Sequence, residues 1–235
     1  MVSWFANAEC QRSPRLGYSI EEGQMVDGVI FDAFGTLLEI RNRQNPYRRL
    51  LRLGSAQGRV ASPDDIRWIM TNACGLQGTA DFFGIKLSST QLTELQSCLE
   101  VELESIRLFE DALPALALLR NHQIKIGVCS NLGGPYCSVA RNLLPGLDGY
   151  ALSAEVGLMK PDVAMYQHIC TQLEVAPSQL PGSNAPHVLM IGDSRRCDAD
   201  GPRVAGIEGY HLDRSGAGRF CDLLEFVTGI NTSRG

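Results

Sequence analysis

The sequence predicts an α/β fold in which a parallel sheet is flanked by helices and interrupted by one inserted all-helical domain. Short apolar, β-prone runs recur along the chain, helical patterns lie between most of them, and one long helical stretch breaks the alternation. Strands that alternate with helices favour right-handed βαβ crossovers and therefore a parallel sheet. The 235 residues provide room for one large domain or for a core with a smaller insertion.

The predicted strands are short and apolar, as expected for strands buried on both faces of a parallel sheet. The first, 29–31, ends at Asp32 and would deliver this acid to the carboxyl edge of the sheet. The other strands are expected at 124–129, 150–152, 188–191 and, with a weaker pattern, 209–212.

Helices are predicted between these strands. Pro114 falls in the first turn of a helix over 111–121, where its missing N–H costs nothing. A helix over 161–173 would place four side chains on one face, at three- and four-residue steps: Val163, Tyr166, Cys170 and Leu173. The remaining helices of the core are expected at 135–144 and 217–227.

Residues 41–108 are expected to be helical throughout and to form a separate cap domain. Ser62 to Asp65 combine a cap, a proline and two acids at a helix start, and Ser88 with Gln91 starts another helix. Its apolar stripe would comprise Leu92, Leu95, Leu99, Leu103 and Ile106. Residues 28–40 and 109–235 then form the core, and 1–27 an N-terminal extension. The cap would cover the carboxyl edge of the sheet, where open α/β sheets bind ligands.

Composition excludes some classes of partner. The net charge of −5 without a basic face argues against nucleic acid. No apolar run approaches a membrane span and no secretion leader stands out, so we expect no membrane partner and a cytoplasmic location. Eight scattered cysteines indicate reduced thiols. The oligomeric state is not readable. One basic cluster fits either a solvated helix face or recognition of an anionic substrate group: Arg41, Arg43, Arg48, Arg49 and Arg52.

Polar residues follow successive strands at the same predicted edge of the sheet: Asp32, Ser130, Lys160, and Asp193 with Asp198. Each alone has an ordinary explanation as a turn former, a helix cap or a surface lysine. Their coincidence at one edge favours a functional site. Three carboxylates facing one lysine would repel each other unless a cation intervened, and a hard divalent ion such as Mg²⁺ suits oxygen ligands.

With a cation and Lys160 drawing off charge, Asp32 can remain ionised and attack an electrophilic centre. The Ser130 hydroxyl and backbone N–H groups near Ala33 and Asn131 would hold the transferring oxygens. The sequence therefore predicts a metal-dependent hydrolase with Asp32 as its nucleophile.

Taken together, these motifs resemble those of the haloacid dehalogenase-like (HAD) hydrolase superfamily, in its branch with a helical cap. The matching stretches are 31–37, 128–131, 160–162 and 191–194 with Asp198, and the resemblance spans roughly residues 28–214. It implies a Rossmann-like sheet, hydrolysis of a small phosphorylated metabolite, and Mg²⁺ as cofactor.

The resemblance also implies the roles of single residues. Asp32, Ser130 and Lys160 would be catalytic, with Asp32 as nucleophile and the other two binding the transferred group. The metal ligands would be Asp32, the backbone carbonyl of Phe34, Asp193 and Asp198. Substrate would be bound by Ala33, Phe34, Thr36 and Asn131, with Thr36 also steadying the first loop.

One departure concerns Phe34, since phosphatases of this family usually carry there a second Asp that serves as general acid and base. Such a group is worth about 10²–10⁴-fold in rate. Dehalogenases of the family resemble this chain at Phe34 and Tyr166 but differ at Asp193 and Arg195.

Three hypotheses for the function follow. The first is a Mg²⁺-dependent phosphohydrolase helped by a good leaving group, a cap-derived acid or water. The others are a 2-haloacid dehalogenase and a weak or inactive member that binds a phosphorylated ligand.

Overall fold

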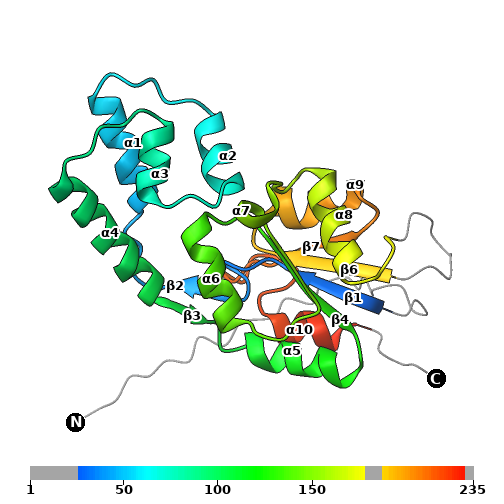
Figure 1. Ribbon diagram of the computed structural model, residues 1–235. Helices are drawn as coiled ribbons and strands as arrows, with labels where there is room; N and C mark the ends of the chain where they lie inside the picture. Colours follow the sequence, from blue (N-terminus) through cyan, green and yellow to red (C-terminus); the bar gives the residue numbers. More distant parts are fainter. Residues whose placement is uncertain (1–25, 178–186, 231–235) are drawn as a thin grey trace, which may run out of the picture.

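The computed structural model describes residues 26–177 and 187–230, so the predicted N-terminal extension lies almost wholly outside the described residues. Its core is a five-stranded sheet in the order β5-β4-β1-β6-β7 (Figure 1). The strands are β1 (Val26–Phe31), β4 (Lys125–Ser130), β5 (Gly149–Leu152), β6 (His187–Gly192) and β7 (Glu208–His211). All neighbouring strands of this sheet run parallel, which confirms the predicted α/β fold.

Helices cover both faces of the sheet (Figure 1). Successive strand residues point to opposite faces, so Val29 and Phe31 pack into one apolar cluster and Ile30 into another. The first cluster is closed by α5 (Ala112–Asn121), α6 (Gly134–Leu143) and α10 (Leu223–Thr228). The second is closed mainly by α8 (Val163–Gln172), with the short α7 (Ser153–Val156) and α9 (Gly201–Val204) beside it.

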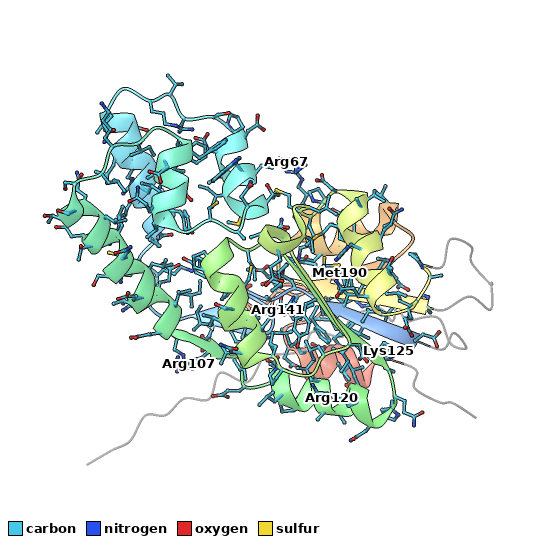
Figure 2. The ribbon with its side chains drawn as sticks, viewed as in Figure 1. Arg67, Arg107, Arg120, Lys125, Arg141 and Met190 are labelled. Carbon is cyan, nitrogen blue, oxygen red and sulfur yellow. The ribbon has the colours of Figure 1, made fainter. Side chains whose placement is uncertain are left out.

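Four further helices form a helical lobe, residues 46–104, beside the carboxyl edge of the sheet (Figure 1). They are α1 (Pro46–Ala56), α2 (Asp64–Thr71), α3 (Leu76–Phe82) and α4 (Ser89–Glu104). The lobe has its own apolar cluster, formed by Leu50, Leu76, Ala80, Ile85 and Leu95. The predicted capping box of Ser88 and Gln91 begins α4. Arg67 on α2 forms an ion pair at 2.6 Å with Asp162 of the core (Figure 2).

Two strands connect the core with the lobe and correct the expectation of helix throughout this stretch. β2 (Leu38–Ile40) pairs antiparallel with β3 (Ile106–Leu108), so the two segments of chain that cross into the lobe hold each other. Ile106 therefore belongs to a strand and not to the α4 stripe. It is buried opposite Ile40 because the ribbon packs against the core.

Two helices of the core begin later than predicted. The last one starts at Leu223 and not at Ala217, because Asp222 caps it by accepting the Glu225 N–H at 2.6 Å. The helix expected from Pro161 starts at Val163, after Asp162 in extended conformation.

No helix in the described ranges is long and apolar enough to cross a membrane. The described cysteines are free thiols, as expected from their scattered positions.

Candidate active site

The carboxyl ends of three adjacent strands bring the predicted polar residues together. Asp32 follows β1, Ser130 ends β4, and Asp193 follows β6. Lys160 reaches the same place from the loop after α7. Because β1 lies between β4 and β6, Asp32 occupies the middle of the site.

Lys160 joins two carboxylates in the interior. Its Nζ lies 2.7 Å from Oδ1 of Asp32 and 2.6 Å from Oδ1 of Asp198, and the lysine is only 2% exposed. The Ser130 hydroxyl donates to the same Asp32 oxygen at 2.8 Å. The other Asp32 oxygen, Oδ2, accepts no hydrogen bond from the described residues. One oxygen of Asp32 is thus held in place while the other is left free.

Burial and mutual repulsion shift the ionisation of this cluster. Burial would lower the pKa of Lys160, but the Asp32 and Asp198 carboxylates outweigh it and raise that pKa well above its ordinary value. Burial raises the pKa of Asp198 to about 6, with Asp32 adding to the rise and Lys160 opposing it. Partial burial raises the pKa of Asp193 as well, and the negative charge of Asp32 is the second cause of this rise. The carboxylates thus carry more negative charge than Lys160 compensates.

The donor set fits a hard divalent cation. Asp32, Asp193 and Asp198 each offer a carboxylate oxygen, and these oxygens lie within 4.8 Å of one another. Two glycines leave this space open: a Cβ on Gly35 would lie 2.1 Å from the Asp193 carboxylate, and one on Gly192 2.4 Å from that of Asp198. Clustered carboxylate oxygens are the ligands that Mg²⁺ prefers. The Phe34 carbonyl as a further ligand stays a prediction.

Asp198 is fixed by a single turn of π-helix, η1 (Arg195–Asp200). The Ser194 N–H donates to Oδ2 of Asp198 at 2.9 Å. Tyr166, fully buried on α8, donates to the Cys197 carbonyl at 2.6 Å. Tyr166 therefore supports this turn and does not line the cavity described below.

Asn131 holds the backbone of Lys160. Its Nδ2 donates to the Lys160 carbonyl at 2.9 Å, and the Lys160 N–H donates to its Oδ1 at 2.8 Å. Ala33 is fully buried, and its carbonyl accepts the N–H groups of Leu37 and Leu38 at 2.8 Å. Both residues shape the site, and their predicted contacts with substrate stay predictions.

Arg214 holds the loop after Asp32 by two of its backbone carbonyls. It donates to the carbonyls of Gly35 at 3.3 Å and Thr36 at 2.6 Å, and Asp111 accepts two hydrogen bonds of 3.0 Å from it. Thr36 is fully buried, does not line the cavity, and its Oγ1 has no partner among the described residues. Its role in substrate binding also stays a prediction.

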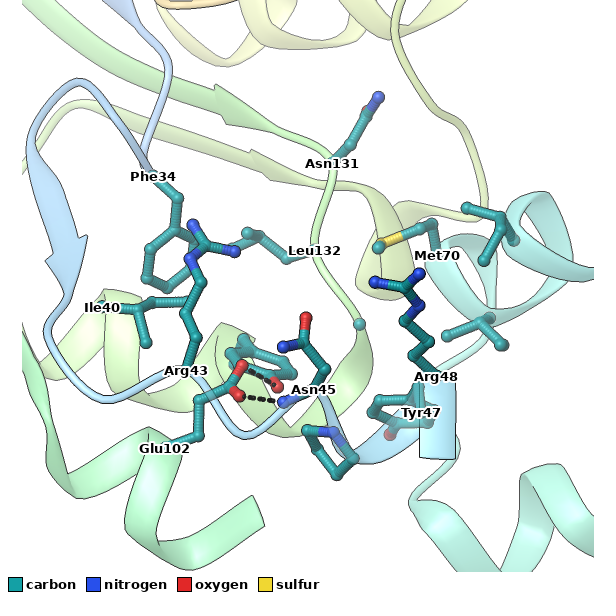
Figure 3. Close-up of a pocket in the computed structure, with 15 residues that line it drawn as sticks. Phe34, Ile40, Arg43, Asn45, Tyr47, Arg48, Met70, Glu102, Asn131 and Leu132 are labelled. Atoms are coloured by element: carbon teal, nitrogen blue, oxygen red, sulfur yellow. Dashed lines mark hydrogen bonds between the residues drawn. The ribbon is translucent and has the colours of Figure 1, made fainter. Parts of the chain in front are cut away.

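A cavity of about 320 Å³ lies between the core and the helical lobe (Figure 3). The core contributes Phe34, Asn131, Leu132, Gly133 and Tyr136, and the lobe contributes Tyr47, Arg48, Ile66, Ile69 and Met70. Arg43 and Asn45 line it from the segment that leads into α1, and Pro46 lines it from the start of α1. Two of its lining residues, Phe34 and Asn131, follow Asp32 and Ser130 by two residues and by one. The cavity therefore approaches the carboxylate cluster, although the residues of the cluster are not among those that line it.

Three residues that shape the site were not among those expected from the sequence: Glu102, Tyr136 and Arg214. Glu102 is 4% exposed, and its Oε2 accepts the N–H groups of Gln44 and Asn45 at 2.6 Å. Its Oε1 accepts the Tyr136 hydroxyl at 2.8 Å (Figure 3). A signal existed, because Glu102 follows Leu95 by seven residues and so shares its helix face. Nothing in the pattern around Arg214 indicates its role.

A family model of the haloacid dehalogenase-like hydrolases matches residues 26–206. No curated protein sequence matched the chain.

Solved structures share the fold. A HAD phosphatase from Thermococcus onnurineus has a TM-score of 0.60 and 22% identity, covering 89% of this chain and 100% of its own. A dehalogenase solved with an intermediate complex has a TM-score of 0.58 and 18% identity, covering 88% and 98%. A HAD-family mutant enzyme from Bacteroides thetaiotaomicron, in complex with magnesium and inorganic phosphate, has a TM-score of 0.53 and 15% identity, covering 80% and 94%. With the family model matching most of its length, this chain belongs to the haloacid dehalogenase-like hydrolases.

Proposed function

We propose that this hydrolase is a Mg²⁺-dependent phosphohydrolase that acts on a small phosphorylated metabolite through Asp32. The observation that carries the proposal is the cluster of Asp32, Asp193 and Asp198 around one buried ammonium, since three carboxylates in this space have no evident role without a cation. The Bacteroides enzyme with the same fold was solved with magnesium and phosphate. In this proposal the helical lobe is the cap predicted for residues 41–108.

The chemistry assigns a role to each residue of the cluster. Oδ2 of Asp32, free of hydrogen bonds from the described residues, forms the new bond to phosphorus while the ester bond to the leaving group breaks. Water then cleaves the aspartyl phosphate and regenerates the carboxylate. Lys160 and Ser130 stabilise charge on the transferring oxygens. A Mg²⁺ ion held by Asp32, Asp193 and Asp198 would neutralise charge on the phosphoryl group.

The leaving group of the preferred substrate should need no protonation. Phe34 carries no proton to donate. The ring of Tyr136 packs edge-on against Phe34, with the ring centroids 6.0 Å apart, and its hydroxyl already donates a hydrogen bond to Glu102. Burial raises the pKa of Tyr136, and the hydrogen bond to Glu102 raises it further. Both carboxylate oxygens of Glu102 are already engaged as acceptors, from Gln44, Asn45 and Tyr136. We therefore infer an activated substrate, such as an aryl, enol or acyl phosphate.

A panel of phosphate esters and acyl phosphates, assayed with Mg²⁺ and with chelator, tests the proposal. Phosphate release should require Mg²⁺ and should be abolished in Asp32→Asn and Asp193→Asn. Asp200→Asn provides a matched control, because Asp200 lies at the end of the same π-turn, is exposed and pairs with Arg203. Absence of Mg²⁺-dependent phosphate release from every compound would contradict the proposal.

Phe34 favours a second candidate, a 2-haloacid dehalogenase, because an apolar side chain beside the nucleophile suits a substrate whose leaving group is a halide. In that reaction Asp32 would displace halide and water would cleave the resulting ester. Halide release from 2-chloro acids in the presence of chelator would identify it. A member that only binds a phosphorylated ligand would show binding without turnover in either assay.

A further inference from the structure

Two arginines line the cavity without a carboxylate partner. Arg43 and Arg48 project into it beside Leu132 and Met70 (Figure 3). Among the described residues, neither forms a hydrogen bond or an ion pair. Neighbouring arginines are committed elsewhere: Arg41 to Glu39, Arg49 to Gln44 and Cys98, and Arg67 to Asp162.

The charge of these two arginines is not balanced within the cavity. Glu102 is the only acid among the lining residues, and its oxygens already accept bonds from Gln44, Asn45 and Tyr136. A guanidinium stays protonated at all physiological pH values and matches a planar oxyanion with two parallel hydrogen bonds. The two arginines therefore give the cavity a positive charge that its own lining does not balance, which favours an anionic ligand.

The rest of the lining is mostly apolar, with Phe34, Ile40, Ile66, Ile69, Met70 and Leu132. The phosphoryl group already has its own partners in Lys160 and Ser130 of the core. Arg43 and Arg48 instead belong to the segment entering the lobe and to α1. The cavity thus combines a mostly apolar lining with two guanidinium groups, that of Arg43 beside Leu132 and that of Arg48 beside Met70 (Figure 3).

We propose that Arg43 and Arg48 bind a second anionic group of the substrate, joined by a short apolar body to the phosphoryl group. The inference rests on the proposed function, because it specifies the substrate class of that same site. It makes this hydrolase selective for carboxylated phosphate esters over neutral ones of the same shape.

A matched pair of substrates tests the proposal: 4-carboxyphenyl phosphate and 4-carbamoylphenyl phosphate, which have the same shape and differ in charge. The double variant Arg43→Ala/Arg48→Ala should lower kcat/KM for the carboxylate by about 10- to 100-fold, as expected for lost charge-assisted bonds. The amide should lose less than about threefold, the scale of a minor contact. Because each comparison uses one enzyme preparation, differences in the folded fraction cancel.

Arg52→Ala is the matched control, since Arg52 lies one turn after Arg48 on α1, is exposed and does not line the cavity. It should leave the ratio between the two substrates unchanged. Equal losses for both substrates in the double variant would overturn the inference, because the arginines would then serve the transferred phosphoryl group or the fold.

A binding measurement separates this inference from the proposed function. Calorimetry with 4-carboxybenzylphosphonate and 4-carbamoylbenzylphosphonate needs no turnover. Tighter binding of the carboxylate, lost in the double variant, would support the inference even if no ester were hydrolysed, an outcome in which the proposed function alone fails. Hydrolysis of both esters together with equal binding of both phosphonates would overturn the inference and leave the phosphohydrolase standing.

Discussion

The side-chain nitrogen of Lys160 lies 2.7 Å from Oδ1 of Asp32, although 128 positions separate the two residues in the chain. The same nitrogen lies 2.6 Å from Asp198. One buried ammonium thus holds together two carboxylates that would otherwise repel each other. We expect both the stability of the fold and the proposed chemistry to depend on Lys160, and Mg²⁺ provides a way to separate the two effects.

Replacement of Lys160 by Met should destabilise the protein most strongly without metal. Two buried carboxylates lose their counter-charge, so we expect the free energy of unfolding in chelator to fall by about 3–5 kcal/mol. Mg²⁺ should restore part of the loss, because a cation on the same carboxylates supplies positive charge. Phosphatase kcat/KM should fall about 10²–10³-fold even with Mg²⁺. Denaturant unfolding with and without Mg²⁺, beside the kinetic assay, measures these effects.

Lys125→Met is the control for that experiment. Lys125 pairs with Asp148 at 3.3 Å, and both side chains are substantially exposed. Its removal should cost no more than about 1 kcal/mol and should not respond to Mg²⁺. Should Lys160→Met match the wild type in chelator, the buried ammonium would contribute nothing to stability.

Phe34→Asp should change the dependence of the rate on the leaving group. An acid at this position can protonate a departing alkoxide, and a well-placed acid is worth about 10²–10⁴-fold. We expect kcat/KM for an alkyl phosphate to rise at least about tenfold relative to p-nitrophenyl phosphate, whose leaving group needs no proton. Phe34→Leu removes the ring without adding an acid and should leave that ratio near the wild-type value. A ratio unchanged in Phe34→Asp would show that proton transfer does not limit the reaction.

Asp65 on α2 should make the stability of the helical lobe depend on pH. Its carboxylate accepts bonds of 2.5 and 2.7 Å from Arg59 and one of 3.0 Å from the Ser62 N–H. The bonds from Arg59 lower the pKa of Asp65, although burial opposes the shift. A carboxyl group whose folded-state pKa is lowered stabilises the fold above its unfolded pKa of about 4, and this contribution is lost as pH falls through the folded-state pKa.

Asp65→Asn should therefore lower the free energy of unfolding at pH 7 by about 1–3 kcal/mol. Its difference from the wild type should shrink as the pH falls below about 4, because the wild-type carboxylate is then progressively protonated. Asp64→Asn, at the exposed neighbouring position, should show a smaller loss. A difference between Asp65→Asn and wild type that is constant from pH 7 to pH 3 would refute the role of the ionised carboxylate.

The sequence predicts the strands of the core well because burial on both faces leaves a direct mark. The runs ending at Phe31 and Ile191 are continuously apolar, and each is followed by an acid that the parallel sheet brings to one edge. Motifs that lie at strand ends can therefore be predicted from the sequence. Lys160 lies in a loop and not at a strand end, and it is predicted from its place in the order of the motifs.

Residues that act through tertiary contacts left weaker signals. The ribbon of β2 and β3 consists of two strands of three residues each, which are too short for a periodic pattern. Its paired residues Ile40 and Ile106 are 66 positions apart in the chain. Glu102 resembles any acid on a helix until its partners Gln44 and Tyr136 are placed beside it. The Arg43 side chain points into the cavity because of how the lobe packs against the core, and no local sequence pattern indicates that packing.

Arg214 should prove to be a positioning residue for the nucleophile. It fixes the carbonyls of Gly35 and Thr36 while Asp111 holds its guanidinium, so its loss frees the loop that carries Asp32. We expect Arg214→Ala to lower kcat about 10- to 100-fold with little change in KM, since a displacement near 1 Å has this effect. Asp111→Asn should act on the same contact, so the double variant should lose less than the product of the single losses. Arg120→Ala is the control, because Arg120 also donates to two carbonyls, at 3.4 Å, but outside the site. An unchanged kcat in Arg214→Ala would show that the loop keeps its shape without this anchor.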